Sequence, residues 1–428
     1  MKKILSAVAI GMSLLSWAVA PVVRDGSVKL YRPNGRNIVY IDYILDGAPA
    51  VVTAEIYSQG KALGLAKSSS VSGDVSRVVK TGACRIVWNA VADYPDRVFT
   101  NAQVKVKAWA TNAPPDFLAV DLDSLDYASA VRWYDGAESV PGGITNDIYK
   151  TQKLLMRKIP AAGVTWMMGS PVLPSPEPNR KKDMETPHYV TLTKDYYMGV
   201  YPVTVGQYTR VVGSIPNNAD VRADPIPLDA ELHPVSGVSY AWQDEDYPHY
   251  LRMDSWPENT SYGAGMFTLG FLGTLSKRFA CLEIDLPTSA QWEFACRAGS
   301  DGAVYGGYSP SEVAWCSDET NRTVAVGRKK PNAYDLYDML GNVWEWCLDI
   351  YPKSVSDTPV TDAPQIDPKG ISYDKSGWTA ANQVFRCRRG GNYASLASEA
   401  RAANCTGRLK TARDSMLGFR VKCSAVAK

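Results

Sequence analysis

The sequence predicts an α+β protein in which a small all-β domain precedes a larger domain of short strands, long loops and a few helices. From about residue 24 to 112, apolar and polar residues alternate as they do in half-buried strands. Beyond residue 155, turns separate short strand-like runs, and two segments carry helix start signals. A chain of 428 residues is long enough for two or three domains, each with its own core.

The first domain is expected to be a small antiparallel sandwich of immunoglobulin-like type, because several short alternating runs follow one another. The clearest runs are Val52–Ile56, Cys84–Trp88 and Val104–Ala110. Cys84 shares a face with two apolar residues, which predicts a buried free thiol that packs as a small hydrophobic group. The stretch contains no acidic pair, glycine-rich loop or basic stripe, so we assign it to spacing or docking.

Two helices are expected in the second half of the chain. One begins at Thr204 and ends at Gly213, and the other begins at Thr288 and turns Cys296 towards the core. Each has a glutamine three residues after its first threonine, which completes a capping box. A third helix is expected over residues 267–278.

Composition excludes several classes of function. The chain has 46 Lys+Arg against 44 Asp+Glu, and a net charge of +2 provides no broad field to attract nucleic acid. With 45% hydrophobic and 21% charged residues, the chain is neither disordered nor a multispanning membrane protein. Three histidines and the lack of any Cys-x-x-Cys pair exclude zinc or iron sites of familiar spacing.

The N-terminus predicts export. Two lysines are followed by residues 4–23 without a charge, as in a secretory signal or an N-terminal anchor. Cleavage is expected after Ala20 or after Ala18, and an uncleaved anchor stays open because about 20 apolar residues can span a bilayer. The protein is therefore expected to be secreted, periplasmic or on the cell surface, with no other membrane span. The short signal indicates a bacterial protein.

These signals divide the chain into a signal peptide over residues 1–20, a sandwich over 21–112, a connector over 113–155 and a C-terminal domain over 156–428. The connector contains Pro114-Pro115 and a Pro-Gly-Gly turn. Its hydrophobic content is too high for a free linker, so it is expected to pack against a neighbouring domain.

A series of motifs runs from about residue 161 to the end of the chain. In chain order they are Trp166–Ser170, Glu185–His188, Tyr197–Thr204, His233–Val235, Leu286–Arg297, Leu336–Trp346, Arg389–Tyr393 and Leu417–Arg420. In this order the motifs resemble the formylglycine-generating enzyme family, also called the sulfatase-modifying-factor domain. The resemblance implies a compact variant of the C-type lectin fold with little regular secondary structure.

The resemblance also locates the family's chemistry. Members that oxidise a substrate cysteine to formylglycine hold copper with two cysteines, whose positions here are Ser395 and Ala400. Because Cu(I) needs thiolate ligands, neither copper nor catalysis is expected. Asn392 replaces the serine of the family's Gly-Gly-Ser segment, and Met416 replaces the asparagine before Leu-Gly-Phe-Arg. The ligand groove implied by the resemblance is formed by Trp344, Asn392, Tyr393, Ser395 and Met416.

A calcium site is implied at a tight turn after the second helix. In the family, calcium is bound by the side chains at the positions of Asp338 and Glu345 and by the backbone carbonyls at those of Gly341 and Val343. Hard oxygen ligands of this kind suit calcium. In the alternative interpretation, Asp338 only caps the turn.

Export permits disulfides, and the resemblance implies two of them among the eight cysteines. It pairs Cys296 with Cys405 and Cys281 with Cys423.

Two further interpretations come from the residues themselves. Cys347 and Cys387 each flank a predicted strand, so they are expected to form a bridge if those strands are neighbours, with Cys316 as a competing partner. Arg389 and Arg401 are expected to be solvated.

Three hypotheses of function follow. The first is a secreted, non-catalytic family member, a pseudoenzyme, whose lectin-like domain binds a peptide, a glycan or a cell-surface protein. The second is a formylglycine-generating oxidase that acts through an altered site. The third is a diversified lectin-fold binding protein whose variable surface lies within Arg388–Arg420.

Overall fold

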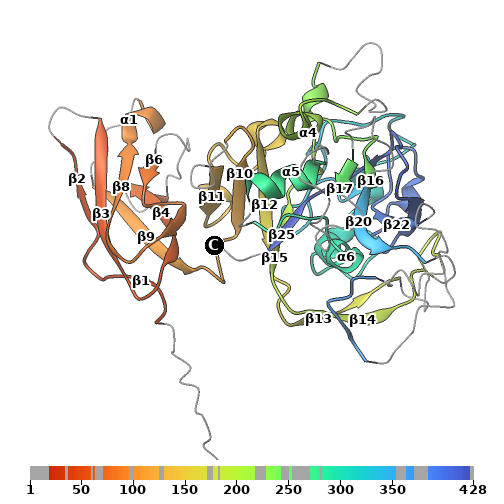
Figure 1. The fold of residues 1–428 in the computed structure, drawn as a ribbon, viewed down its shortest axis with the longest axis horizontal. Coiled ribbons are helices and arrows are strands. Elements are labelled where there is room, and N and C mark those ends of the chain that lie inside the picture. Colours follow the sequence, from red (N-terminus) through yellow and green to blue (C-terminus); the bar gives the residue numbers. More distant parts are fainter. Residues whose placement is uncertain are drawn as a thin grey trace, which may run out of the picture.

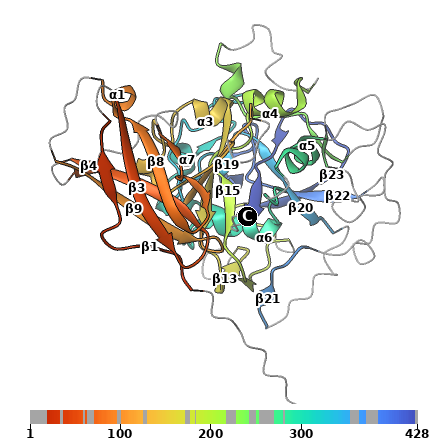
Figure 2. The ribbon, with the colours of Figure 1, turned by 60° about the vertical axis from the view of Figure 1, so that its left-hand side comes forward.

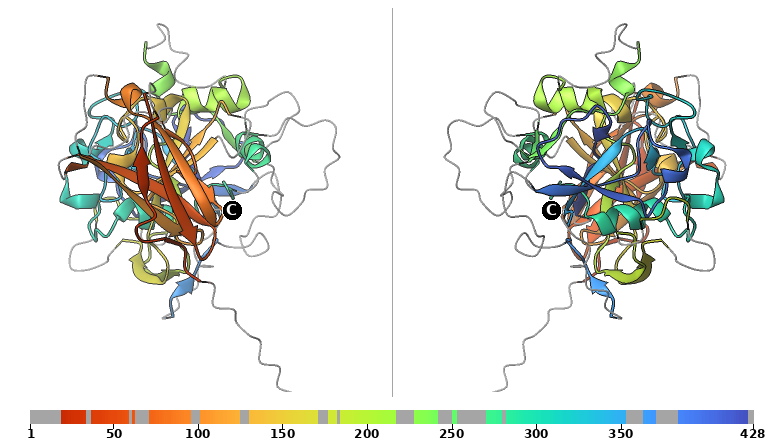
Figure 3. Two further views of the ribbon diagram at one scale, coloured as in Figure 1. Left: turned by 90° about the vertical axis from the view of Figure 1, so that its left-hand side faces the viewer. Right: turned by 90° about the vertical axis from the view of Figure 1, so that its right-hand side faces the viewer.

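The computed structural model describes residues 19–33, 37–58, 61–62, 71–95, 101–124, 130–170, 177–181, 184–216, 228–241, 250–252, 270–279, 282–352, 363–370 and 384–424. An all-β domain packs against one end of a larger domain (Figure 1), and Figures 2 and 3 show the same arrangement from other sides. Residues 1–18 of the expected signal peptide lie outside the described residues.

The N-terminal domain consists of two antiparallel sheets. One has the strand order β1-β3-β8-β6, with β2 added to β3, and the other has the order β5-β4-β7, with β9 paired to β4. The first sheet contains β1 (Val22–Val23), β2 (Lys29–Tyr31), β3 (Ile38–Asp46), β6 (Val71–Gly73) and β8 (Gly82–Asn89). The second contains β4 (Ala50–Ser58), β5 (Lys61–Ala62), β7 (Arg77–Val79) and β9 (Ala102–Ala110), and the short helix α1 (Ala90–Asp93) follows β8.

The apolar side chains of the predicted alternating runs form the core between these sheets. In β8 the side chains of Cys84, Ile86 and Trp88 are buried, and they share one apolar cluster with Val52 and Ile56 of β4. Cys84 is a buried free thiol, as expected. The two-sheet architecture agrees with a sandwich, and its immunoglobulin-like type stays a prediction.

The stretch expected to be a connector forms part of the larger domain. Its strands extend a five-stranded antiparallel sheet with the order β11-β10-β12-β15-β25. Leu118 and Val120 face one core cluster, whereas Phe117 and Ala119 face another, so β10 is buried on both sides. The strands are β10 (Phe117–Asp121), β11 (Val131–Tyr134), β12 (Lys153–Ile159), β15 (Tyr196–Gly199) and β25 (Lys422–Ser424).

The expected helices are present. Helix α4 (Val205–Val212) and helix α6 (Ser289–Arg297) both begin with complete capping boxes, and α4 ends at Gly213 in the left-handed conformation. Helix α5 (Phe271–Arg278) confirms the described part of the third. The shorter helices are α3 (Ile148–Thr151) and α7 (Pro310–Val313), with single 3₁₀ turns at η2 (Ala137–Ser139), η4 (Ala230–Leu232), η5 (Tyr305–Gly307) and η9 (Ala397–Glu399).

A four-stranded sheet with the order β23-β22-β20-β24 carries the residues of the expected groove. Its strands are β20 (Trp344–Ile350), β22 (Phe385–Arg389), β23 (Cys405–Leu409) and β24 (Leu417–Gly418). Smaller sheets pair β13 (Val164–Met168), β14 (His188–Leu192) and β21 (Gln365–Ile366), β16 (Ser239–Ala241) with β17 (Tyr250–Arg252), and β18 (Ala314–Trp315) with β19 (Leu340–Gly341).

The two domains share buried contacts. Val51 of β4 belongs to the same core cluster as Leu118 and Trp133 of the larger domain. The Trp133 amide donates to the Ser76 carbonyl at 3.1 Å. In the part of the chain that the structure describes, no helix is long and apolar enough to cross a membrane.

Candidate functional site

The expected groove residues gather where β20, β24 and the loop after β22 meet. The Trp344 amide donates to the Met416 carbonyl at 2.8 Å, and the Tyr393 amide donates to the Asn342 carbonyl at 2.9 Å. Trp344 pairs with Leu417 across the parallel strands β20 and β24. The fold therefore brings together segments that lie far apart in the sequence.

The two positions at which the family's copper ligands are expected are both occupied by buried, non-thiol side chains. The Ser395 hydroxyl donates to Asn392 Oδ1 at 3.0 Å and accepts from the Asn392 amide at 3.2 Å, so these two residues satisfy each other within one turn. Ala400 is fully buried at 0% exposure. A hydroxyl engaged in this way and a buried methyl group provide no soft metal ligand.

Cys316 is a thiol close to Ser395, and the sequence motifs did not indicate this proximity. It lies beside this turn, because the amide of Ser317 donates to the Ser395 carbonyl at 3.0 Å. Burial raises the pKa of Cys316 to about 11, which keeps it a thiol at neutral pH. Among the residues that the structure describes, no three His, Cys, Asp or Glu side chains are placed to hold a metal ion.

The side chains expected to form the groove are largely buried. Trp344, Asn392, Tyr393 and Ser395 are only 5–7% exposed. The Arg388 guanidinium lies 4.8 Å from the centre of the Trp344 ring.

Asp414 and Arg408 hold the Arg388 guanidinium in place over the Trp344 ring. Arg388 lies 3.9 Å from Asp414, which also pairs with Arg408 at 3.2 Å. Burial lowers the pKa of Arg388 to about 10, and Asp414 partly offsets this effect. We refer to Arg388, Arg408 and Asp414 as the Arg388 layer, which the motifs did not reveal.

The turn expected to bind calcium offers only part of a ligand set. Asp338 is buried, its Oδ2 accepts from the Gly327 amide at 2.6 Å, and its Oδ1 has no partner within the described structure. The Glu345 carboxylate is already engaged by Arg420 at 2.8–3.0 Å and by the Trp292 indole at 2.6 Å. One orphaned oxygen therefore fits a cation, whereas the second carboxylate is neutralised by an arginine.

The expectation that Arg389 and Arg401 are solvated is wrong. Arg401 is 2% exposed and forms a bidentate pair with Glu185 at 2.6 and 2.8 Å. Arg389 is buried and lies 3.0 Å from Glu293. Buried guanidinium groups need carboxylate partners, and here the chain supplies both partners from distant segments.

The expected disulfides are absent from the structure. All seven described cysteines are free thiols, so neither the Cys296–Cys405 bridge nor the Cys347–Cys387 bridge is formed. Cys281, the expected partner of Cys423, lies outside the described residues. Strands β20 and β22 are neighbours, as the Cys347–Cys387 bridge requires. However, antiparallel β22 and β23 place Cys405 on the same face as Cys387, and the interaction between these two thiols raises the pKa of Cys387 and lowers that of Cys405.

Comparison with known proteins decides the family. The model of the FGE-sulfatase family, described as "Sulfatase-modifying factor enzyme 1-like domain", matches residues 157–425, which is more than half of the chain. The chain belongs to the formylglycine-generating enzyme family. This confirms the resemblance that the ordered motifs indicated.

Proteins similar to this chain carry different names. The chain is 28% identical to serine/threonine-protein kinase pkn1 of Chlamydia pneumoniae over 243 residues, which cover 55% of this chain and 34% of the kinase. It is 36% identical to the formylglycine-generating enzyme of Thermomonospora curvata over 103 residues, or 20% of this chain and 33% of that enzyme. The chain thus spans about a third of the length of these two relatives.

One solved structure is also similar to this chain. PvdO from Pseudomonas aeruginosa is 23% identical to this chain, with a TM-score of 0.45, and the match covers 63% of this chain and 94% of PvdO.

Proposed function

We propose that the protein is an exported, non-catalytic member of this family whose C-terminal domain binds a peptide, a glycan or a cell-surface protein. The observation that carries the proposal is the closed state of the two copper positions, a hydroxyl bonded within its own turn at Ser395 and a buried methyl group at Ala400. Without two thiolates, the site has no means to hold Cu(I) for oxygen chemistry.

The proposed ligand contacts the Arg388 layer, which lies over Trp344. Arg408 is 46% exposed, whereas Trp344 lies under the Arg388 guanidinium. Two arginines beside one aspartate leave an excess of positive charge at this spot, which favours a ligand with carboxylate or other anionic groups.

An aldehyde assay tests the absence of catalysis. The full chain is incubated with Cu(I), oxygen and a peptide that contains Cys-x-Pro-x-Arg, and aldehyde is trapped with a hydrazide and measured by mass spectrometry. No aldehyde above the protein-free background is expected. Aldehyde formed in proportion to the amount of protein would establish the oxidase hypothesis instead.

A binding screen tests the ligand surface. Peptide and glycan arrays are probed with the unchanged chain and with Arg388→Ala/Arg408→Ala, and Arg85→Ala in the N-terminal domain serves as the matched control. Signals are expected to be lost in the double variant and kept in the control. Signals that persist in the double variant would place the ligand elsewhere.

Calcium binding at the turn belongs to the same proposal and rests on the orphaned Oδ1 of Asp338. Titration calorimetry with calcium compares the unchanged chain with Asp338→Ala. Saturable binding that disappears in the variant supports the site. If Asp338→Ala binds calcium as the unchanged chain does, Asp338 is not a ligand and only caps its turn.

A further inference from the structure

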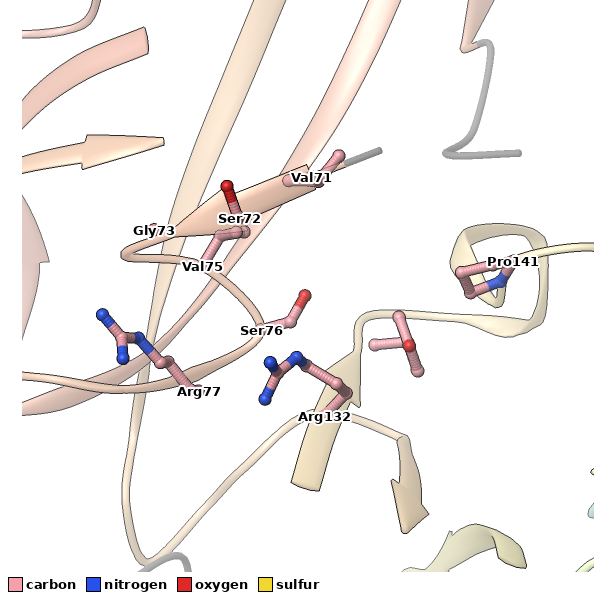
Figure 4. Close-up of a pocket in the computed structure, with 9 residues that line it drawn as sticks. Val71, Ser72, Gly73, Val75, Ser76, Arg77, Arg132 and Pro141 are labelled. Atoms are coloured by element: carbon pink, nitrogen blue, oxygen red, sulfur yellow. The ribbon is translucent and has the colours of Figure 1, made fainter. Parts of the chain in front are cut away.

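The two domains meet along one face of the sheet that contains β4 and β9. On this face Val51 of β4 shares a core cluster with Trp133 of the larger domain. Nearby, the Trp133 amide donates to the Ser76 carbonyl at 3.1 Å. Figure 4 shows this neighbouring part of the junction, where Ser76 and Arg77 come from the N-terminal domain and Arg132 comes from β11 of the larger domain. The two domains are therefore in direct contact along this face.

A lysine from the N-terminal domain reaches across the junction. Lys107 of β9 and Glu55 of β4 lie on neighbouring strands, and the Lys107 Nζ is 3.6 Å from Glu55 Oε1. Lys107 also forms an ion pair with Asp135, which directly follows β11 in the larger domain. We refer to Lys107, Glu55 and Asp135 as the junction triad.

The junction triad is largely shielded from water. The exposed fractions of the side chains are 29% for Lys107, 14% for Glu55 and 11% for Asp135. The Trp109 ring lies 5.9 Å from the Lys107 Nζ, and its indole is fixed by a 2.8 Å hydrogen bond to the Thr53 hydroxyl. Because water is a product when an amine and a carboxyl group condense, its exclusion favours the condensed state over hydrolysis.

The two carboxyl groups of the triad have different environments. Burial raises the pKa of Asp135 and the neighbouring Glu55 adds to this effect, although Lys107 opposes it. The Tyr57 hydroxyl donates to Glu55 Oε2 at 2.7 Å. Burial acts to raise the pKa of Glu55 as well, but this hydrogen bond and the charge of Lys107 together lower it. Asp135 therefore takes up a proton more readily, and Glu55 stays available as a proton acceptor.

We propose that Lys107 and Asp135 form an isopeptide bond, an amide between their side chains, which joins the two domains covalently, and that Glu55 moves the proton. The ammonium proton first passes to Asp135 across the ion pair, which leaves a neutral amine beside a neutral carboxyl group. The Lys107 Nζ then attacks the Asp135 Cγ, so that an Nζ–Cγ bond forms and one Cγ–O bond breaks. Glu55 takes a proton from Nζ and delivers it to the departing hydroxyl group, which leaves as water. The step needs no oxidant, reductant or further reactant.

The bond is expected to form slowly after folding. Burial lowers the pKa of Lys107, but the two carboxylates outweigh burial and raise it. The ammonium is therefore the resting form, and the amine arises only when its proton passes to Asp135. The proposal concerns the junction alone and is independent of the ligand proposed for the Arg388 layer.

Mass spectrometry of the full chain tests the proposal, after incubation until the mass no longer changes. The chain is expected to be lighter by one water molecule than the mass calculated for its N-terminus. A digest is expected to contain the peptides of Lys107 and Asp135 joined through their side chains. The linked peptides decide, because a cyclic imide at Asp135-Gly136 would also remove one water. Recovery of Lys107 and Asp135 only in separate peptides would show an ordinary ion pair and overturn the proposal.

Variants test the role of each group. Lys107→Arg keeps the positive charge and is expected to abolish the linked peptides, whereas Lys105→Arg, at an exposed position of the same strand, is expected to leave them unchanged. Asp135→Asn is expected to form the same amide with loss of ammonia in place of water. Glu55→Gln is expected to slow the reaction about tenfold or more.

The outcomes against these roles are equally defined. Linked peptides that persist in Lys107→Arg would mean that another lysine is joined, and an unchanged rate in Glu55→Gln would remove Glu55 from the reaction. The peptide map of the unchanged chain remains decisive if a variant fails to fold.

Discussion

At the scale of single residues, buried charge is the feature that the sequence could not show. Arg401 looks like a surface residue in the sequence, yet its carboxylate partner Glu185 lies 216 positions away. Glu345 and Arg420 are 75 positions apart and form a similar pair in the core. Local patterns contain no information about partners at such separations, whereas the capping boxes at Thr204 and Thr288 depend on neighbouring residues and were predictable.

The substitution Arg401→Met is expected to destabilise the protein by about 3–5 kcal/mol, because it leaves the Glu185 carboxylate buried and unpaired. Arg85→Met is the matched control. Arg85 forms a similar bidentate pair with Asp42, but on the surface, and its loss is expected to cost much less because water screens an exposed pair. Urea unfolding under reducing conditions measures both. Equal losses of unfolding free energy would show that burial of the Arg401 pair has no energetic consequence.

Asp349 makes stability depend on pH. Burial raises its pKa to about 6, although the Ser289 amide and Arg389 partly oppose this shift. The folded protein therefore binds more protons than the unfolded chain between about pH 4 and pH 6, so stability falls as the pH rises through this window. Asp349→Asn removes this contribution and keeps an acceptor for the Ser289 amide.

The unfolding free energy of Asp349→Asn, minus that of the unchanged protein, is expected to rise by about 2 kcal/mol from pH 4 to pH 7. Asp46→Asn is the control, since a hydrogen bond from Arg24 lowers the pKa of Asp46, so the contribution of Asp46 to stability changes with pH in the opposite direction. Urea unfolding at several pH values provides the data. A difference that stays flat over this range would contradict a raised pKa at Asp349.

At the scale of elements, local sequence signals predicted where helices begin better than where they end. Helix α6 begins at a complete capping box but ends at Ala298, which has a left-handed backbone with φ of 46°. Glycine usually occupies such a position, so the sequence contains no stop signal there. The strands of the expected connector were missed for a different reason. They are buried on both faces, and their apolar runs lack the alternation that identifies half-buried strands.

Ala298→Gly is expected to stabilise the protein by about 0.5–1 kcal/mol, because it removes the steric strain of a left-handed alanine. Ala290→Gly, within the same helix, is expected to destabilise it by about 1 kcal/mol or more. Thermal unfolding of the two variants gives the sign of each effect. Destabilisation by both would mean that the backbone at Ala298 is not strained.

At the scale of the whole molecule, the ordered motifs predicted the family, which the match over residues 157–425 confirms. They also predict that the family's copper positions fall on Ser395 and Ala400, and this stays a prediction. They could not show that Trp344 is covered, because the Arg388 layer depends on how three strands and a loop assemble. Nor could they reveal the contact of Lys107 with Asp135 between the domains, since these residues come from segments without any shared motif.

The most direct test of a non-catalytic family member is a Cu(I) titration against a chromophoric competitor under reducing conditions. The unchanged chain is expected to compete no better than Ser395→Ala. Ser395→Cys/Ala400→Cys, which restores both thiols, is expected to bind one Cu(I) tightly if the surrounding fold is preserved. Tight binding of one Cu(I) by the unchanged chain, retained in Ser395→Ala, would contradict the assignment and point to another thiol site.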